Sequence, residues 1–266
     1  MDRRLLGKTA LVFGGGSCAP GWGNGKAASV LLARAGAKVA VVDINKAAAE
    51  ETVALILEEG GSAIALGGDI TRRDQIDRAV LTCRDVLGEV DILLNNVGVV
   101  TGGGLEDLTA ERWQAAFDVN VTGFFHTCQA VMPAMRKRKS GAVVNIGSIG
   151  GARQIGIDYP AYAAAKAALV QLTRSLAVEY APHGVRVNAV IPGLIDTPLV
   201  MASLARLYDG VEISRIIAKR HAQVPMGHMG DAWDVAEAVV FLASDAAKYI
   251  TGADIPVDGG LSCTTR

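Results

Sequence analysis

TALVFGGGSCAPGWGNGKAASVLLARAGAKVAVVD, residues 9–43, contains the pattern that decides the fold. An apolar run at 9–13 leads into a glycine-rich turn, and the turn leads into a segment whose apolar residues recur at three- and four-residue spacing. A second apolar run follows at 38–43. A strand, a glycine-rich turn, a helix and another strand in this order predict a βαβ unit of a parallel sheet.

The same alternation of short apolar runs and helical patterns continues along the chain. Most of the runs are apolar throughout, as strands buried on both faces of a parallel sheet must be. We therefore predict a Rossmann-type, doubly wound α/β fold with helices on both faces of a seven-stranded parallel sheet. The predicted strands are 9–13, 38–43, 62–69, 90–96, 141–148, 185–192 and 253–259.

Three of the predicted helices, at 26–36, 45–60 and 73–88, end in glycine, which predicts left-handed caps. No linker or low-complexity tract interrupts the pattern, so 1–266 is interpreted as a single dinucleotide-binding oxidoreductase domain. Only the segment at about 194–225 departs from the alternation, with no further strand expected until about residue 253. We interpret this segment as a lid over the site, although an ordinary surface excursion remains an alternative.

Bulk composition limits the classes of partner. The 26 basic and 27 acidic residues leave a formal net charge of −1, which gives no electrostatic basis for binding nucleic acid or an anionic membrane. No signal peptide or spanning segment is evident, so we expect a cytoplasmic protein that acts on a small molecule. The cysteines and histidines lack metal-ligand spacing, and we predict neither a metal site nor disulfides; the cysteines are Cys18, Cys83, Cys128 and Cys263.

The glycine-rich turn predicts a nucleotide site. Gly23-x-Gly25-x-x-Ala28 fits the dinucleotide fingerprint, in which glycines let backbone N–H groups approach a pyrophosphate at a helix N-terminus. Asp43 ends the second strand about 20 residues on, where a carboxylate can accept hydrogen bonds from ribose hydroxyls and repel a 2′-phosphate. This favours NAD(H) over NADP(H), while a turn or capping role for Asp43 before Asn45 remains the alternative.

A second group of residues predicts proton-transfer chemistry. Tyr162 and Lys166 are four residues apart in a helical pattern, so they share a helix face. Ser148 ends the fifth predicted strand, at the carboxyl edge where parallel sheets bind ligands. A tyrosine pKa of about 10 is too high for a base at neutral pH, and we expect the nearby Lys166 ammonium to lower it.

At this point the chain resembles the short-chain dehydrogenase/reductase family, over essentially its whole length. The turn containing Gly14, Gly23, Asn24 and Gly25 resembles the family's T-G-x-x-x-G-x-G, although Phe13 replaces the threonine and the turn is longer than is common. Asn95 to Gly98 resembles N-N-A-G, and Asp69-Ile70 resembles the pair beside the adenine ring. Ser148 with Tyr162 and Lys166 matches the Ser and Y-x-x-x-K set, and Pro192-Gly193 through Thr197 resembles the nicotinamide loop.

The resemblance implies roles for these residues. Tyr162 would exchange a proton with the substrate oxygen, Ser148 would hold that oxygen, and Lys166 would bind the nicotinamide ribose. Asn120 would hold a water that links Lys166 to solvent, and the assembly would be a homotetramer built on helices around 109–136 and 158–181. The implied cofactor-binding residues are Gly14, Gly23, Asn24, Gly25, Asp43, Asp69, Ile70, Asn96, Gly98, Tyr162, Lys166, Pro192, Gly193, Ile195 and Thr197.

The expected activity is interconversion of a secondary alcohol and a ketone by direct hydride transfer with NAD(H). Two alternatives stay open. Tyr159 stands at the wider spacing from Lys166 that enoyl-thioester reductases of the same superfamily use. A non-catalytic nucleotide-binding sensor with the same fold is the other alternative.

The predicted substrate site includes Ser148, Gln154, Tyr162 and Leu194. Its expected walls are small or apolar, which favours a neutral, moderately hydrophobic substrate. Arg153 is the one nearby charge that would recruit an anion instead, and solvation in a loop is the commoner fate of such a residue. The further wall residues expected are Gly150, Gly151, Ala152, Ile155, Leu199, Met201 and Leu204.

Overall fold

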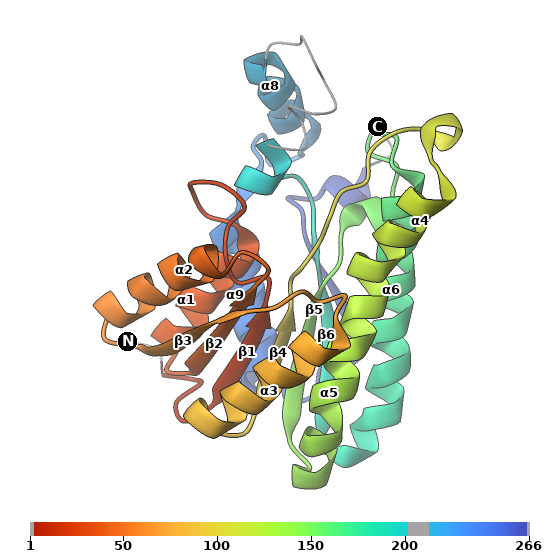
Figure 1. Cartoon of the computed structure of the whole chain (residues 1–266). Helices are drawn as coiled ribbons and strands as arrows, with labels where there is room; N and C mark the ends of the chain where they lie inside the picture. Colours follow the sequence, from red (N-terminus) through yellow and green to blue (C-terminus); the bar gives the residue numbers. More distant parts are fainter. Residues whose placement is uncertain (1–2, 202–212, 265–266) are drawn as a thin grey trace.

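Seven parallel strands form the central sheet, in the order β3-β2-β1-β4-β5-β6-β9 (Figure 1). The computed structural model describes residues 3–201 and 213–264. All seven predicted strands are confirmed within these ranges. They are β1 Thr9–Phe13, β2 Lys38–Asp43, β3 Ser62–Gly67, β4 Ile92–Asn95, β5 Gly141–Ile146, β6 Val185–Pro192 and β9 Asp254–Val257.

Four of these strands are shorter than predicted. The strands β3, β4 and β5 each end one or two residues before the predicted carboxyl boundary, and β9 is shortened at both ends. The residues beyond the carboxyl ends, such as Asn96 and Ser148, leave the hydrogen-bonded ladder and enter loops. The predicted boundaries included the glycine and polar residues that follow each apolar run, and sequence pattern alone could not locate the last hydrogen-bonded residue.

Helices cover both faces of the sheet, as predicted (Figure 1). One hydrophobic cluster packs α1 (Asn24–Arg34), α2 (Lys46–Glu58) and α9 (Ala232–Ala243) against one face. Another packs α3 (Arg73–Leu87), α5 (Gly123–Arg138) and α6 (Pro160–Tyr180) against the other face. Positive φ angles at Gly36 (99°) and Gly60 (78°) agree with the predicted left-handed caps. Gly88 also has a positive φ (108°), but its ψ of −178° lies outside the left-handed helical region, so the third cap differs from the prediction.

The strand order reverses between β1 and β4, which are neighbours in the sheet although they are distant in sequence. Connections on the two sides of this point run in opposite directions, so they leave a crevice at the carboxyl ends of the strands. Ligands bind at such a point in open α/β sheets. The fold therefore places the end of β1 and the end of β4 beside each other at the expected site.

A π-helical segment, Asp118–Thr122, joins α4 (Ala110–Phe117) to α5. Asn120 lies within it and is fully buried, and its side-chain amide donates to the backbone oxygens of Ala116 and Val99. π-helical turns occur frequently at functional sites. Short 3₁₀ turns occur at Leu105–Asp107, Ile149–Gly151, Ala181–His183, Asp245–Ala247 and Leu261–Cys263.

The lid segment contains a small sheet that the sequence did not reveal. Strand β7 (Ile195–Asp196) pairs in parallel with β8 (Gly230–Asp231), so the expectation of no strand before about residue 253 is wrong. Two-residue strands are too short to leave a period-two pattern. Helix α8 (Ile213–Gln223) lies beyond the carboxyl ends of the main strands (Figure 1). Residues 202–212 of the predicted lid, including Leu204, fall outside the described residues.

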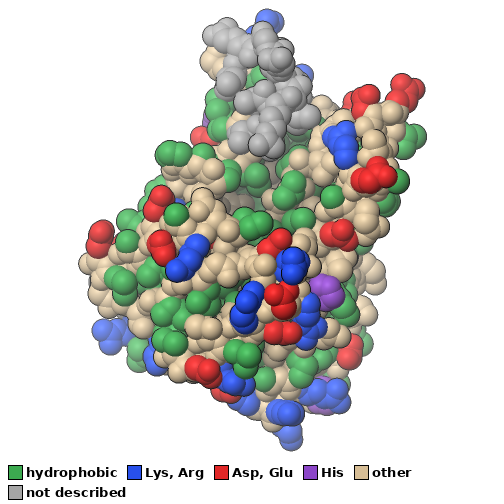
Figure 2. Space-filling model, viewed as in Figure 1, with side chains coloured by type: hydrophobic (Ala, Val, Ile, Leu, Met, Phe, Trp, Pro, Cys, Tyr) green, Lys and Arg blue, Asp and Glu red, His purple; other side chains and the backbone are tan. Residues whose placement is uncertain are grey.

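Two negative findings apply to the described ranges. No helix there has both the length and the apolar character needed to cross a bilayer. No group of three or more His, Cys, Asp or Glu side chains in residues 3–201 and 213–264 is placed to hold a metal ion. Positive and negative side chains are interspersed on the face shown in Figure 2, in keeping with the near-zero net charge.

Candidate active site

A cavity of about 470 Å³ opens at the carboxyl edge of the sheet, over the point where the strand order reverses. In Figure 2 apolar side chains border the recess below the grey atoms. Every residue predicted to bind the nucleotide contributes to the cavity wall, although these residues come from six separate segments of the chain. They are Gly14, Gly23, Asn24, Gly25, Asp43, Asp69, Ile70, Asn96, Gly98, Tyr162, Lys166, Pro192, Gly193, Ile195 and Thr197.

The start of α1 has the features of a pyrophosphate site. Its N-cap, Gly23, has no side chain to cap the first N–H groups, which are left for an anionic ligand. A Cβ atom at Gly25 would overlap the backbone oxygen of Gly14 and the side-chain amide of Asn96, so only glycine fits there. The buried side-chain oxygen of Asn24 has no hydrogen-bond partner among the described residues. These observations fit a dinucleotide bound across the turn.

The long glycine-rich turn is held by an aromatic contact. The ring of Trp22 packs against Trp233 at the start of α9, with ring centroids 4.6 Å apart. The Lys26 ammonium lies 5.4 Å from the centre of the Trp22 ring, a favourable cation–π arrangement. Since Trp22 immediately precedes the N-cap of α1, this contact positions the uncapped helix end.

The Asp43 carboxylate is fixed at the end of β2. One oxygen accepts from the backbone N–H of Gly16 and the other from that of Asn45, each at 3.0 Å. The cap of α2 is the Asn45 side chain, which accepts from Ala47. Asp43 thus has a turn role, and it also borders the cavity. The turn role and the predicted ribose-binding role of Asp43 are compatible, because each carboxylate oxygen can accept more than one hydrogen bond.

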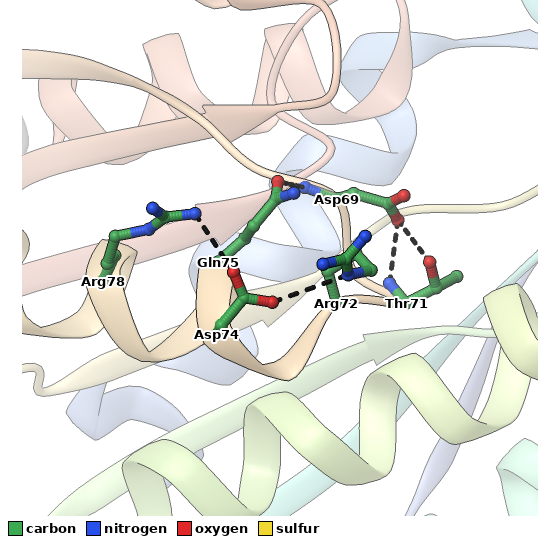
Figure 3. Close-up of polar contacts among 6 residues, drawn as sticks. All are labelled: Asp69, Thr71, Arg72, Asp74, Gln75 and Arg78. Carbon is green, nitrogen blue, oxygen red and sulfur yellow. Dashed lines mark hydrogen bonds and ion pairs between the residues drawn. The ribbon is translucent and has the colours of Figure 1, made fainter.

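Asp69 and Ile70 lie in the loop after β3. Figure 3 shows the Asp69 carboxylate accepting from both the backbone N–H and the hydroxyl of Thr71, each at 2.8 Å. Gln75 reaches back to accept from the backbone N–H of Asp69, and Asp74 pairs with Arg72 and Arg78 on the outer side of the loop (Figure 3). The loop conformation is therefore set by its own polar side chains.

Asn95 and Asn96 have different structural functions. The Asn96 side chain donates to the Gly14 backbone oxygen at 2.7 Å and so joins β4 to the glycine-rich turn. Asn95 is fully buried, donates to Asn145 of β5 at 2.9 Å, and accepts from Thr127 of α5. Asn95 thus stabilises the sheet beneath the site and does not reach the cavity wall.

Ser148 and Tyr162 meet at the inner part of the cavity. Ser148 follows β5, and its hydroxyl oxygen accepts from the backbone N–H of Gly150 at 3.1 Å. Tyr162 occupies the first turn of α6, which begins with Pro160 at a position that helices tolerate. Burial raises the pKa of the Tyr162 phenol above its usual range, and a hydrogen bond with Ser148 opposes this increase.

Lys166 is buried one turn further along α6, where 2 % of its surface is exposed. Its ammonium donates to the backbone oxygen of Ile146 at 2.9 Å and lies 5.9 Å from the centre of the Tyr162 ring. Loss of solvent lowers the pKa of Lys166 to about 7. Burial raises the pKa of the Tyr162 phenol and only the Ser148 hydrogen bond is seen to oppose it, so the lowering of this pKa by Lys166 stays a prediction.

Asn120 lies near Lys166 and is not among the residues that line the cavity. Gly98 separates it from Lys166. A Cβ atom at Gly98 would lie 3.5 Å from the Asn120 side-chain oxygen and 3.6 Å from the Lys166 nitrogen. The absence of a side chain at Gly98 therefore leaves the two polar groups facing the same small space.

The substrate end of the wall differs in part from the prediction. Ile155, Leu194 and Leu199 line the cavity as predicted, but Gly150, Gly151, Ala152, Gln154 and Met201 do not. The Gln154 side-chain oxygen instead accepts from the backbone N–H groups of Gly156 and Ile157, which fixes the loop. Arg153 donates to the backbone oxygens of Ala152 and Ser262 and is also outside the wall.

The wall residues missed as substrate contacts include two polar ones, Tyr159 and Arg220. Tyr159, 6 % exposed, is the N-cap residue of α6; its sequence position suggested only an alternative proton donor. Arg220 of α8 is 9 % exposed and also lines the cavity. Charged residues occur on all sides of the α8 sequence, so no periodic signal distinguished the buried one.

Comparisons with known proteins agree with this geometry. The sequence model of a family described as "Enoyl-(Acyl carrier protein) reductase" matches residues 19–262. The chain is 37 % identical to 2-(S)-hydroxypropyl-CoM dehydrogenase 3 of Xanthobacter autotrophicus, over 98 % of this chain and 99 % of the relative. It is also 37 % identical to levodione reductase of Leifsonia aquatica, over 97 % of this chain and 96 % of the relative.

A solved structure from Burkholderia xenovorans, assigned to the short-chain dehydrogenases/reductases, superposes with a TM-score of 0.91. It shares 43 % sequence identity, and the match covers 99 % of both chains. The two named relatives are a dehydrogenase and a reductase. The chain therefore belongs to the short-chain dehydrogenase/reductase family.

Proposed function

We propose that the protein is an NAD(H)-dependent oxidoreductase that interconverts a secondary alcohol and a ketone, with Tyr162 as the acid/base. The observation that carries this proposal is the meeting of Ser148, Tyr162 and Lys166 in one cavity with the nucleotide-binding turn. A phenol, a hydroxyl and an ammonium in that arrangement can hold a carbonyl oxygen and exchange a proton with it.

In ketone reduction, the Tyr162 hydroxyl donates its proton to the substrate oxygen. Because burial raises the pKa of Tyr162, the phenol stays protonated through neutral pH and is ready to act as an acid. The Ser148 hydroxyl donates to the same oxygen and fixes the position of the carbonyl carbon. A bound nicotinamide supplies or accepts the hydride.

Lys166 and Asn120 assist this proton transfer without donating the proton to the substrate themselves. We assign the Lys166 ammonium to the ribose hydroxyls next to the nicotinamide, since it lines the cavity beside Tyr162. The amide of Asn120 faces the same space at Gly98, where a water would connect Lys166 with solvent.

The choice of NAD(H) over NADP(H) rests on Asp43. Its carboxylate borders the cavity at the end of β2, and backbone N–H groups of Gly16 and Asn45 hold it there. A 2′-phosphate at this position would meet a like charge that cannot easily turn away. The ribose hydroxyls of NAD(H) would instead donate to the carboxylate.

The substrate is proposed to be largely apolar. The wall beyond Ser148 is formed mainly by aliphatic side chains, which include Ile149, Ile155, Leu194 and Leu199. Such a wall accommodates hydrocarbon and leaves orientation to a few polar groups. The names of two relatives, a hydroxypropyl-CoM dehydrogenase and levodione reductase, agree with oxidation of an alcohol or reduction of a carbonyl group.

A second candidate function is reduction of an enoyl thioester, which the description of the matching family favours. In that case Tyr159 would be the proton donor, because it also lies in the cavity wall. Tyr162 lies closer to Lys166 in sequence and interacts with Ser148, which supports carbonyl chemistry instead.

A substrate panel separates these functions. Secondary alcohols with NAD⁺, and the matching ketones with NADH, should be turned over, as followed by the absorbance of the reduced nucleotide. Crotonyl thioester with NADH should give no turnover. The reverse result would establish enoyl reduction, and nucleotide binding without turnover of any compound would indicate a sensor.

A further inference from the structure

Tyr159 lies beside the proposed proton donor. It is the N-cap residue of α6, and its ring meets the ring of Tyr162 nearly edge-on, with centroids 5.5 Å apart and an interplanar angle of 81°. Only 6 % of its surface is exposed, and it forms part of the cavity wall. The two phenols are therefore adjacent parts of one site.

The Tyr159 hydroxyl makes no hydrogen bond to any residue in the described ranges. It lies against the backbone of Gly150, where an added Cβ atom would come within 2.7 Å of the hydroxyl oxygen. Gly150 also donates its N–H to Ser148, so the Tyr159 hydroxyl is close to the group that would hold the reacting oxygen. The hydroxyl oxygen is not among the fully enclosed side-chain atoms that lack a partner, so it stays open to the cavity, where a ligand can accept its hydrogen bond.

The surroundings of Tyr159 keep it a hydrogen-bond donor. Burial and, to a smaller extent, Tyr162 raise its pKa to about 12, while the charge of Arg220 acts in the opposite direction. The phenol thus stays protonated at neutral pH. Arg220 lines the same cavity and is 9 % exposed, so its positive charge further favours an electron-rich atom in this region.

The adjacent wall is mainly aliphatic, with Ile149, Ile155, Ile157 and Leu194 among its residues. The hydrocarbon part of a substrate packs well against such a wall but gives the Tyr159 hydroxyl no hydrogen-bond acceptor. A site that holds a buried donor discriminates strongly against ligands that lack the matching acceptor.

We propose that the hydroxyl of Tyr159 binds a second oxygen atom of the substrate, so that preferred substrates carry a hydroxyl or carbonyl oxygen in addition to the reacting one. This proposal rests on the proposed alcohol and ketone chemistry at Ser148 and Tyr162. It makes Tyr159 a specificity-determining residue, in contrast to the proton donor that the enoyl-reductase candidate requires.

Ligand binding tests the proposal without turnover. Ketones cannot accept hydride from an oxidised nucleotide, so protein saturated with NAD⁺, and with NADP⁺ in parallel, can be titrated calorimetrically. The probes are four ketones without a hydroxyl group: cyclohexanone, cyclohexane-1,4-dione, and 3- and 4-methoxycyclohexanone. The second oxygen of the last three can accept a hydrogen bond but cannot be oxidised by the nucleotide. At least one of these three ketones should bind about tenfold or more tightly than cyclohexanone.

In Tyr159→Phe this preference should fall to about twofold or less, because the donor is removed and the ring is kept. Tyr249→Phe, at a fully exposed position, serves as the matched control and should retain the full preference. The proposal is overturned by an unchanged preference in Tyr159→Phe, by the absence of a preference in the wild type, or by no measurable binding of all four ketones.

Parallel turnover assays with NADH keep this test distinct from the proposed function. A binding preference that depends on Tyr159, together with no ketone reduction by the wild type, would reject the proposed reaction but retain the role of Tyr159. Ketone reduction by the wild type, together with a binding preference that is unchanged in Tyr159→Phe, would reject the role of Tyr159 but retain the proposed reaction. Loss of reduction in Tyr159→Phe with full reduction in Tyr162→Phe would overturn both assignments.

Discussion

The buried ammonium of Lys166 donates a hydrogen bond to the backbone oxygen of Ile146 at 2.9 Å. This bond joins the catalytic helix α6 to the end of β5, two residues before Ser148. The ammonium has given up almost all contact with solvent, which lowers the pKa of Lys166 to about 7. Burial of the charged Lys166 side chain thus reduces the stability of the fold.

Lys166 should therefore make stability depend on pH in a defined window. Between pH 7 and the ordinary lysine pKa of 10.5, the unfolded chain binds a proton at Lys166 that the folded chain does not. The free energy of unfolding should fall as pH decreases through this window, by at most about 1.4 kcal/mol per pH unit, and level off below pH 7. Lys166→Met should remove this contribution.

Urea unfolding of the wild type and Lys166→Met, without nucleotide, from pH 6 to 10 measures this difference. Other titrating groups contribute equally to both proteins and cancel. As pH decreases towards 7, the wild type should lose unfolding free energy relative to Lys166→Met. A difference that is constant with pH would show that Lys166 keeps an ordinary pKa in the fold.

Asp43 should control the choice of nucleotide. NAD(H) should give a kcat/KM at least about tenfold above that for NADP(H), a difference of about 1.4 kcal/mol. Asp43→Asn keeps the shape and one carbonyl acceptor but removes the charge, so it should narrow this ratio mainly by improving the use of NADP(H). Steady-state kinetics with both nucleotides checks this, and an unchanged ratio would place the discriminating residue elsewhere.

Gly25 should be intolerant of any side chain. In Gly25→Ala the new methyl group would overlap the Gly14 backbone oxygen and the Asn96 amide, and overpacking of this kind costs about 1–3 kcal/mol. Gly104→Ala is the matched control, because nothing lies within 4 Å of its added Cβ and its φ of −71° suits alanine. Urea unfolding should show a loss for the first variant only, with weaker NADH binding; equal stability of the two variants would contradict the packing argument.

The contact of Trp22 with Trp233 should stabilise the long turn. A double-mutant cycle with Trp22→Ala, Trp233→Ala and the double variant should give a coupling free energy of about 0.5–1.5 kcal/mol in urea unfolding. Trp22→Ala should also weaken NADH binding, since Trp22 adjoins the N-cap of α1. Additive effects of the two substitutions would mean that the rings do not support one another.

The sequence predicted the seven strands and the helices on each face because buried parallel strands are apolar along their whole length. The residues that it predicted to bind a nucleotide line one cavity, since the glycines, Asp43 and Asn96 stand at fixed positions relative to those strands. The small sheet of β7 and β8 and the π-helical turn at Asn120 were not predicted. Both depend on a few backbone hydrogen bonds that no side-chain pattern records.

The substrate wall was predicted less well than the nucleotide wall. Gln154 was placed in the cavity, but its side chain satisfies the backbone of its own loop. Tyr159 and Arg220 line the cavity because α6 begins beside it and α8 lies beyond the carboxyl ends of the main strands (Figure 1). Loops and lids are set by tertiary contacts, so sequence spacing gives little information about which side chains point inward. The direction of the Tyr162 pKa shift likewise depends on burial, which only the fold shows.

The turnover of Tyr162→Phe tests the central claim most directly. The substitution keeps the ring and removes the proposed proton donor, so kcat for the best ketone of the panel should fall by roughly 100-fold or more. The dissociation constant for NADH, measured by nucleotide fluorescence, should stay within about threefold, because the fold and the glycine-rich turn are untouched. Turnover that persists in Tyr162→Phe at a rate near that of the wild type, with NADH bound, would contradict the account.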